Sequence, residues 1–567
     1  MDTDCRTLIV TSLPSNSNPT AGSRTLWLAL LVTALISAAC IHYVEGLKET
    51  ALCFPDPKSW FNSFLVVIAS TEPAGLYVVL GFCVLTAFLT WRRLHFLPLP
   101  WKSFSPRKII LVLAATSSVV SVLGTWLITH HHPLACDEFM PDFQARIFLS
   151  GKLQAEIPED LRFVSRALTP LQAMRTSDDS HWNQGYLPVY AAMRTPFLWL
   201  HLEMLVNPLF GVIAILAMAG VIRLLWPGKP WLAVAGTAMV ALSPQILVND
   251  MTVYAMPAHL ALNTVWLWLY LQPGKRRFWL APIVGVLAIG LHSPFVHALF
   301  VVPFLIRLLL DRRWKAVCIY GIIYLGGCAG CWYWWHVFAP DNAAPSTPLL
   351  VWHLQRILAT VPLNLLLLLS WNTLPCIILA LVGLRFFPQL PVPVRDGVIS
   401  CLLTFCFYAL LPFNQSYGWG NRYCYGVLGC LILLAVAGLN EWTTRAPGRE
   451  PGQFVLLGLA GTVLVLIPLR FSQVERFIRP FARAESSFNQ MDADLVIFDS
   501  RVAWNSGDLL RNGPFLENRP LIANQRHLTP ENIEALMKQF PRTHFVNREE
   551  MAGYGLFTTP WRPPAAD

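Results

Sequence analysis

Three acidic residues lie close together just after an apolar segment, and their types and spacing suit them to chemistry. Asp137 and Glu138 are adjacent, and Asp142 follows about one helical turn later, beyond the apolar run 109–129. A charge at the end of a membrane span is energetically costly. A carboxylate that faces a cavity there is therefore a candidate functional residue. It can act as a general base on an acceptor hydroxyl while a lipid-borne phosphate leaves from the other face of a sugar.

The sequence also allows these three acidic residues to have a purely structural role. The apolar residues of the segment recur at every fourth position, namely Phe139, Phe143 and Ile147, and Gly151 follows as a C-cap would. The pattern predicts a helix that starts near Asp137. In that helix Asp137 is expected to be the N-cap, Glu138 a first-turn acid favoured by the helix dipole, and Asp142 the partner of Arg146.

The composition predicts a polytopic helical membrane protein. The 567-residue chain is 55% hydrophobic and only 13% charged, with a mean hydropathy of +0.49. Soluble proteins carry roughly 25% charged residues, and here the depletion is spread over many apolar runs. The net charge of +9 does not indicate nucleic-acid binding, because the Lys and Arg residues lie in short loops between apolar runs, where they set membrane orientation. We expect no nucleic acid among the partners.

Apolar runs divide the chain into about thirteen predicted membrane spans, with charged residues expected at the span ends. The spans cover residues 25–44, 63–90, 109–129, 204–226, 231–248, 256–271, 278–291, 295–310, 316–337, 363–386, 397–412, 423–439 and 453–469. The first run is too long for the apolar part of a signal peptide and is expected to remain as a span. The segments near 278–310 are short, so the number of spans there is uncertain by one pair of helices.

Positive charge assigns the sides of the membrane. The connection 91–108 carries five Lys or Arg residues and no acid, which predicts a cytoplasmic loop. The N-terminus is then cytoplasmic, whereas Asp137 and the C-terminal end of the chain lie outside the cytoplasm. We expect a plasma (inner) membrane; an endoplasmic-reticulum membrane would place the same face in the lumen.

The predicted organisation has three regions. Residues 1–107 hold a cytoplasmic tail and two N-terminal spans, and residues 108–470 form the main membrane region with a long outer loop, 130–203. The segment 338–362 predicts an interfacial helix that lies on the membrane. Residues 471–567 are soluble in character and predict a small α/β domain, with strands at 495–499 and 543–546 and a helix that opens at 529.

The acidic motif resembles that of the GT-C membrane glycosyltransferases. Asp137-Glu138 just after a span, with the sequence Phe-Gln-Ala-Arg-Ile-Phe-Leu-Ser-Gly-Lys-Leu at 143–153, is similar to the first outer loop of protein O-mannosyltransferases, lipid A aminoarabinose transferases and their bacterial relatives. The resemblance extends to the segments 184–188, 242–244 and 420–423 and covers most of 108–440. The two spans before residue 91 depart from the simplest pattern of the family.

The resemblance implies an enzyme that uses a sugar donor carried on a polyprenyl phosphate. It implies an acceptor outside the cytoplasm, which can be a lipid, a glycan or a protein, and inversion at the anomeric carbon. Asp137 matches the family's catalytic aspartate by its motif position and is expected to be the base. Glu138 is expected to hold the acceptor, orient a residue or help to bind a divalent metal ion, which many members of the family use.

Four more residues on the outer side are candidates for substrate contact. Arg422 lies alone in a loop otherwise free of charge, and its guanidinium matches phosphate geometry, although snorkelling at the interface is an alternative. His292 can donate to phosphate, ligate a metal or simply be a satisfied interfacial residue. Asp250 can touch substrate or end a helix, and His181 can form part of an acceptor platform. The consecutive histidines 130–132 project in different directions, so they do not predict a shared metal ion.

Two other classes of function stay in view. One is a transporter or flippase, which would show inverted repeats and charges inside its spans. The other is a non-catalytic protein of envelope assembly, in which the C-terminal domain carries the function and the acidic motif is structural. The presence of both Asp137 and Glu138 and the expected placing of charges at span ends favour the glycosyltransferase.

Overall fold

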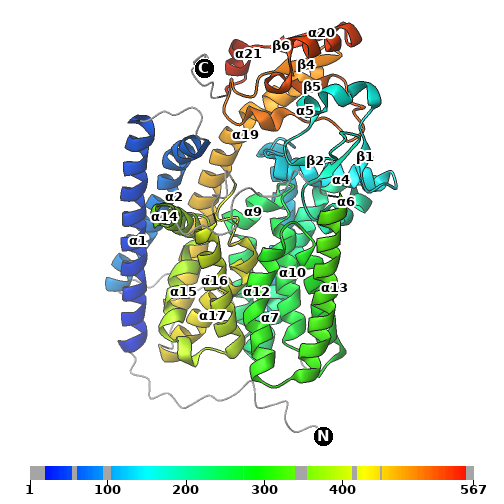
Figure 1. Cartoon of the computed structure of the whole chain (residues 1–567). Coiled ribbons are helices and arrows are strands. Elements are labelled where there is room, and N and C mark those ends of the chain that lie inside the picture. The colour runs from blue at the N-terminus through cyan, green and yellow to red at the C-terminus, as the bar shows by residue number, and fades with distance from the viewer. Residues whose placement is uncertain are drawn as a thin grey trace.

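The computed structural model describes residues 20–53, 60–92, 104–272, 274–338, 354–411, 418–446 and 450–556. Most of these residues are helical, and the long helices run side by side in a bundle below a smaller mixed region (Figure 1). The helices of the bundle are α1 (Thr20–Cys53), α2 (Trp60–Trp91), α3 (Pro106–Leu127), α7 (Val206–Leu225), α8 (Pro230–Ala241), α9 (Pro244–Asp250), α10 (Met256–Tyr270), α11 (Ala281–Ile289), α12 (Pro294–Leu310), α13 (Trp314–Phe338), α14 (Leu354–Ser370), α15 (Leu374–Arg385), α16 (Val392–Leu410), α17 (Leu428–Arg445), α18 (Glu450–Gly461) and α19 (Ile467–Gln490).

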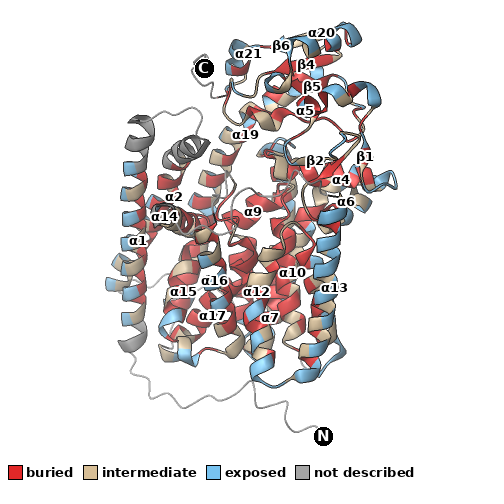
Figure 2. Ribbon diagram, in the orientation of Figure 1, coloured by how far each residue is buried: buried red, intermediate tan, exposed pale blue. Residues whose placement is uncertain are grey.

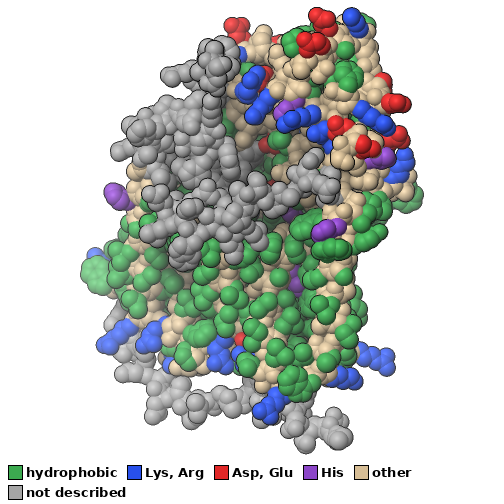
Figure 3. Space-filling model, in the orientation of Figure 1, with side chains coloured by type: hydrophobic (Ala, Val, Ile, Leu, Met, Phe, Trp, Pro, Cys, Tyr) green, Lys and Arg blue, Asp and Glu red, His purple; other side chains and the backbone are tan. Residues whose placement is uncertain are grey.

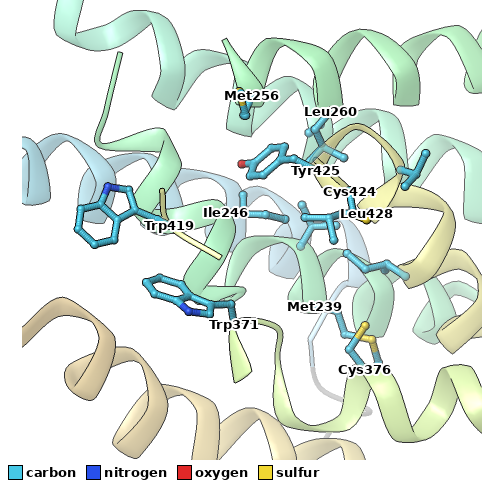
Figure 4. Packing of buried hydrophobic residues seen from close by; sticks show 14 of the residues in the cluster. Met239, Ile246, Met256, Leu260, Trp371, Cys376, Trp419, Cys424, Tyr425 and Leu428 are labelled. Carbon is cyan, nitrogen blue, oxygen red and sulfur yellow. The ribbon is translucent and has the colours of Figure 1, made fainter. Parts of the chain in front are cut away.

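The polytopic helical character predicted from the sequence is confirmed. Eight helices of the described chain are long and apolar enough to cross a membrane, or ten if each of two bent pairs is one span. Hydrophobic side chains form a broad band over the bundle, with Lys and Arg along one rim and both signs of charge on the mixed region at the other end (Figure 3). Inside the bundle, side chains such as Ile246, Met256, Trp371, Trp419 and Tyr425 pack against one another (Figure 4).

Two of the predicted spans are broken rather than straight. Helices α8 and α9 meet at an angle of 57°, and the described parts of α14 and α15 meet at 115°. Proline stands in the first turn of the second helix in each pair, as Pro244 and Pro375. Because proline lacks an N–H donor and disfavours helix in the residue before it, each chain bends there. The predicted spans 231–248 and 363–386 are corrected accordingly.

Three further predicted spans are shorter than a bilayer requires. Helix α10 has 15 residues, α11 has 9 and α12 has 17, whereas a straight span needs about 20. The count of about thirteen spans is therefore not confirmed, and the discrepancy falls partly where the segments were already short. Of the predicted interfacial helix at 338–362, residues 339–353 lie outside the described residues, and α14 begins at Leu354.

Helix α2 carries a buried charge close to the start of its candidate span, Thr71–Trp91. Glu72 lies inside this helix and is buried, and its Oε2 accepts hydrogen bonds from Arg470 Nη2 of α19 at 2.8 Å and from Ser370 Oγ at 2.9 Å. The indole Nε1 of Trp371 donates to Glu72 Oε1 at 3.1 Å. The sequence predicted the span but not the partner, which lies 398 positions away. This ion pair ties α2 and α19 to the bend between α14 and α15.

We expect Glu72→Ala to destabilise the protein strongly, because it leaves Arg470, which is 0% exposed, without its counter-ion. Breaking a buried pair from one side costs about 3–5 kcal/mol. Thermal unfolding of the purified protein in detergent measures the effect as a lower Tm. Arg479→Ala is the matched control, since the Arg479–Glu475 pair is half-exposed and its loss is expected to leave the Tm unchanged. Equal Tm values for both variants would contradict the structural role of Glu72.

The mixed region contains two small sheets and the helices around them. Its elements are α4 (Cys136–Leu149), β1 (Ala155–Glu156), α5 (Ser165–Leu168), β2 (Ala173–Arg175), β3 (His181–Gln184), α6 (Val189–Trp199), β4 (Leu495–Phe498), β5 (Leu521–Asn524), α20 (Pro530–Gln539), β6 (Thr543–Val546) and α21 (Arg548–Gly553). The first sheet is antiparallel in the order β1-β3-β2, and the second is parallel in the order β5-β4-β6. Strands β4 and β6 and helix α20 lie where the sequence predicted them, whereas β5 was missed.

The outer loop and the C-terminal region share one hydrophobic core. Met140, Phe143 and Ile147 of α4 and Trp182 of β3 belong to the same buried cluster as residues of β4, β5 and α20. Strands β4 and β5 are buried at all four positions and β3 at three of its four, whereas β2 and β6 are mostly half-buried (Figure 2). Helix α19 continues through residue 471 without a break, so the predicted boundary between the membrane region and the C-terminal domain falls inside a helix.

Candidate functional site

The acidic motif opens helix α4 in a way that differs from the expected cap. The N-cap is Ala135, whose backbone is extended, and Cys136, Asp137 and Glu138 form the first turn. The prediction that Asp137 caps the helix is wrong. Its carboxylate is directed to partners outside α4, and the Cys136 N–H donates instead to Asp508 Oδ1 at 3.0 Å.

Asp137 is the centre of a compact polar cluster. Its Oδ2 lies 2.5 Å from Arg422 Nη2, and its Oδ1 accepts a hydrogen bond from the Tyr186 hydroxyl. The Arg422 guanidinium in turn lies over the ring of Tyr254, 4.4 Å from its centroid. Arg422 is 7% exposed, so carboxylate and guanidinium meet largely away from solvent, where their attraction is strong.

Opposing effects set the protonation of this cluster. Burial alone would raise the pKa of Asp137, but the charge of Arg422, with smaller effects of His292 and the hydrogen bond from Tyr186, holds that pKa below its usual value. Burial and the neighbouring carboxylate raise the pKa of Tyr186, so its phenol keeps the proton that it donates. The structure therefore contains an ionised Asp137 that accepts from Arg422, from Tyr186 and, at 3.7 Å, from the Cys136 thiol.

Glu138 differs from its neighbour in both contacts and protonation. Its Oε2 accepts from the Val253 N–H at 3.2 Å, whereas its buried Oε1 has no hydrogen-bond partner among the described residues. The side chain is 2% exposed. Burial raises the pKa of Glu138 to about 7, against the smaller opposing effect of the Val253 N–H. Two adjacent carboxylates thus have separate proton affinities, as acid–base sites require.

We expect the stability of the protein to fall as the pH rises from about 4.5 to 7, in part because of Glu138. Its folded-state pKa of about 7 exceeds the unfolded value of 4.5, so the folded state binds more protons in that window. Glu138→Gln removes this titration and should raise the Tm above wild type at pH 8 but not at pH 4. The full effect is on the order of 3 kcal/mol. Parallel Tm curves for the two proteins would contradict the raised pKa.

His292 lies beside the cluster. It lies between α11 and α12, and its ring packs against Tyr186 with centroids 4.1 Å apart. Burial lowers the pKa of His292 to about 4, partly offset by the Asp137 charge, so the imidazole is neutral at pH 7. Its Nε2 is buried without a hydrogen-bond partner in the part of the chain that the structure describes. A neutral imidazole can donate to or accept from a substrate.

The other two sequence candidates lie elsewhere. Asp250 ends α9 and is buried against Gly211 of α7; its Oδ1 is also without a hydrogen-bond partner within the described residues. Among the described residues, no hydrogen bond or ion pair joins Asp250 to the Asp137 cluster. His181 lies on β3, and its Nδ1 is 2.8 Å from Ser180 Oγ. The structure therefore brings together Asp137, Glu138, Arg422 and His292 and leaves Asp250 and His181 apart.

The loop that carries Arg422 is anchored by amide side chains. Gln245 Nε2 donates to the Asn421 carbonyl at 2.8 Å, and Asn249 Nδ2 donates to the Trp419 carbonyl at 2.9 Å. Gly420 has a φ of +75°, and a Cβ there would lie 2.6 Å from the side chain of Gln245. The close approach therefore needs glycine. These bonds fix the loop against α9 and so position Arg422.

Several contacts of the site were not predicted from the sequence. Tyr186 lies in the segment 184–188 that carried the family resemblance, but nothing local showed that its hydroxyl reaches Asp137. The expected Asp142–Arg146 pair is wrong, because Asp142 receives Arg194 of α6 in two hydrogen bonds, at 2.6 and 2.9 Å. That bidentate pair joins α4 to α6.

The described residues do not fit the divalent metal ion that the family resemblance raised. Among the described ranges, no group of three or more His, Cys, Asp or Glu side chains is arranged to hold a metal ion. Asp137 is already engaged by Arg422 and Tyr186, and a divalent ion needs several converging oxygen or nitrogen ligands.

Comparison with known proteins identifies the fold. No protein-family model and no curated protein matches the chain. Two crystal structures of ArnT from Cupriavidus metallidurans do match. The structure bound to undecaprenyl phosphate is 14% identical, covers 76% of this chain and 88% of that chain, and has a TM-score of 0.50. The apo structure is 12% identical, with coverages of 73% and 85% and a TM-score of 0.49. The resemblance predicted from the acidic motif is confirmed in the fold: the chain has the GT-C architecture of the aminoarabinose transferase ArnT.

Proposed function

We propose that this protein transfers a sugar from a polyprenyl-phosphate-linked donor to a lipid, glycan or protein acceptor outside the cytoplasm, with inversion at the anomeric carbon. The observation that carries the proposal is the 2.5 Å pairing of Asp137 with Arg422 directly beyond span α3. It joins a potential base to a potential phosphate-binding group. The fold adds support, since the matching ArnT structure holds undecaprenyl phosphate.

The proposed orientation places the site outside the cytoplasm of a plasma (inner) membrane, with a cytoplasmic N-terminus. The Lys and Arg residues along the rim of the bundle far from α4 support it (Figure 3), because cytoplasmic ends of membrane proteins are rich in these residues. A polyprenyl donor can then reach the site from the bilayer while the acceptor enters from the aqueous side.

The proposed reaction is a single displacement. The acceptor oxygen forms a bond to the anomeric carbon as the bond from that carbon to the phosphate oxygen breaks. The acceptor proton moves to the Asp137 carboxylate, and the bonding electron pair leaves with the polyprenyl phosphate. Arg422 holds the phosphate as its negative charge grows, which favours the transition state over the bound donor.

Arg422 also couples donor binding to the strength of the base. Before the donor binds, Arg422 holds the pKa of Asp137 low, which makes the carboxylate a weak base. A donor phosphate that shares the guanidinium weakens this hold, so Asp137 becomes more basic when the leaving group is in place. In the free protein the low pKa of Asp137 keeps its carboxylate from taking up a proton before the donor is bound.

Glu138 is suited to hold the acceptor beside the base. Its Oε1 is buried and unpartnered within the described chain, so a hydroxyl that reaches it gains a hydrogen bond that the protein does not supply. With a pKa of about 7, Glu138 can accept from or donate to that hydroxyl near neutral pH. His292, whose ring packs against Tyr186, is suited to a second polar group of the substrate.

The test of the proposal is transfer from a panel of radiolabelled polyprenyl-phosphate sugars in membranes that contain the protein, compared with membranes that lack it. We expect label to leave one donor, appear in an acceptor fraction and release polyprenyl phosphate in equal amount. Movement of intact donor across the membrane without bond cleavage would instead indicate a flippase, and no change with any donor would favour a non-catalytic envelope protein.

A further inference from the structure

The C-terminal region contacts the acidic helix at its first turn. Asp508 Oδ1 accepts the Cys136 N–H at 3.0 Å, and Cys136 is the first residue of α4, with Asp137 and Glu138 next. The first N–H groups of a helix have no partner within it. Ala135 has no side chain that can satisfy one, so a carboxylate 372 positions away in the sequence serves as the cap.

A second contact holds the backbone just before α4. The Arg511 guanidinium donates to the Pro133 carbonyl and, through Nη1 at 2.9 Å, to Glu485 Oε2 of α19. Glu485 Oε2 lies 2.5 Å from His132 Nδ1. Burial lowers the pKa of His132 to about 4, against the smaller opposing effect of its hydrogen bond to Glu485. The Arg511–Glu485 ion pair thus fixes the chain between α3 and α4.

A third contact reaches the side of α4 itself. The Arg511 guanidinium lies 5.9 Å from the centroid of the Phe139 ring, one residue beyond Glu138. In addition, Trp182 Nε1 donates to the Pro514 carbonyl at 2.7 Å, and α4 shares a hydrophobic core with β4, β5 and α20. The segment 508–514 therefore touches the start, the side and the supporting sheet of the helix that carries both carboxylates.

We propose that Asp508 is a positioning residue for the transfer site: by capping α4 from the C-terminal region, it fixes the first turn on which Asp137 and Glu138 lie. The proposal rests on the proposed function for its consequence in catalysis. It assigns the C-terminal region a role in the geometry of the site that needs no contact with either substrate.

The cap has an effect that simple support of the fold would not have. Without it, the first turn of α4 loosens while Arg422, which is anchored by α9, stays in place. The donor phosphate is then still held, but the base and acceptor group are displaced, and small displacements of reacting groups are costly. A positioning role therefore predicts a loss in kcat without a matching change in the KM for the donor.

The experiment compares Asp508→Ala, Asp508→Asn and the control Asp499→Ala in the full-length protein. Asp499 is in the same C-terminal region, but its described bonds go to Arg501 rather than to α4. We expect Asp508→Ala to lower kcat about tenfold with an unchanged donor KM. The Asn variant should restore most of it, because its amide oxygen still accepts the Cys136 N–H. Equal loss in the Ala and Asn variants, or none in either, would overturn the proposal.

Amide hydrogen exchange separates this proposal from the proposed function. We expect residues 134–140 to exchange faster in Asp508→Ala than in wild type or Asp499→Ala, with equal Tm values. Hydrogen exchange does not depend on turnover, so it tests the role of Asp508 even if the wild-type protein transfers no sugar. That result would contradict the proposed function but not the capping role of Asp508. Unchanged exchange in these residues would overturn the cap.

Discussion

Replacing Asp137 with Asn should lower the kcat of sugar transfer by about a hundredfold or more, because the amide keeps the size of the carboxylate but cannot take the acceptor proton. The KM for the donor should not rise. Arg422 would lose the anion that lies 2.5 Å away, so its guanidinium would be at least as available to the donor phosphate. Steady-state kinetics with the active donor measure both constants on purified protein.

The control for this variant is Asp178→Asn, an exposed acid in the same outer loop that bonds with Ser180. It should transfer sugar at the wild-type rate. A wild-type kcat in Asp137→Asn would remove Asp137 from the mechanism. A donor KM that rises in parallel with the loss of kcat would show that Asp137 serves binding rather than proton transfer.

Replacing Arg422 with Gln should raise the KM for the donor by about tenfold to a hundredfold, since a charge-assisted hydrogen bond is worth about 1.5–3 kcal/mol. The Lys variant should recover part of the affinity but not all, because it keeps the charge and loses the planar fork that lies over Tyr254. Donor titrations of the purified variants measure the change. Arg162→Gln, which alters a partly exposed Arg of the same outer loop, is the matched control.

The pH profile gives Arg422 a second test with a defined sign. In the free protein its charge is the main influence that lowers the pKa of Asp137 against burial. Removing it should raise that pKa, so the acidic limb of the kcat/KM profile should move to higher pH in Arg422→Gln, where the base must still be ionised to act. A limb that stays in place would show that Arg422 does not act on the base.

Local patterns were sufficient to predict the parts of the site that lie in one stretch of chain. The acidic pair after a span, the isolated Arg422 and the apolar periodicity of α4 are all visible within a few residues. The structure brings Arg422 to Asp137, as a shared outer face allows. The strands β4 and β6 were also visible, because each is a short apolar or β-branched run.

Contacts between distant segments left no such pattern. Asp508 caps α4 and Arg470 pairs with Glu72 across several hundred residues, and the choice between Arg146 and Arg194 as partner of Asp142 depends on how α6 packs on α4. The predicted pair between Asp142 and Arg146 within α4 was therefore wrong. The bends at Pro244 and Pro375 were recoverable, since each proline interrupts an apolar run. Strand β5 has four residues, like β4 and β6, but it follows Pro520 in a stretch where no strand was predicted.

The most direct test of the account is the anomeric configuration of the product made by purified protein in liposomes. A single displacement with Asp137 as base and Arg422 on the leaving phosphate predicts a product of opposite configuration to the donor. It also predicts one free polyprenyl phosphate for each bond formed. Nuclear magnetic resonance of the anomeric centre reads the first, and extraction of the lipid reads the second. A product with retained configuration, or donor consumed without a transferred sugar, would contradict the account.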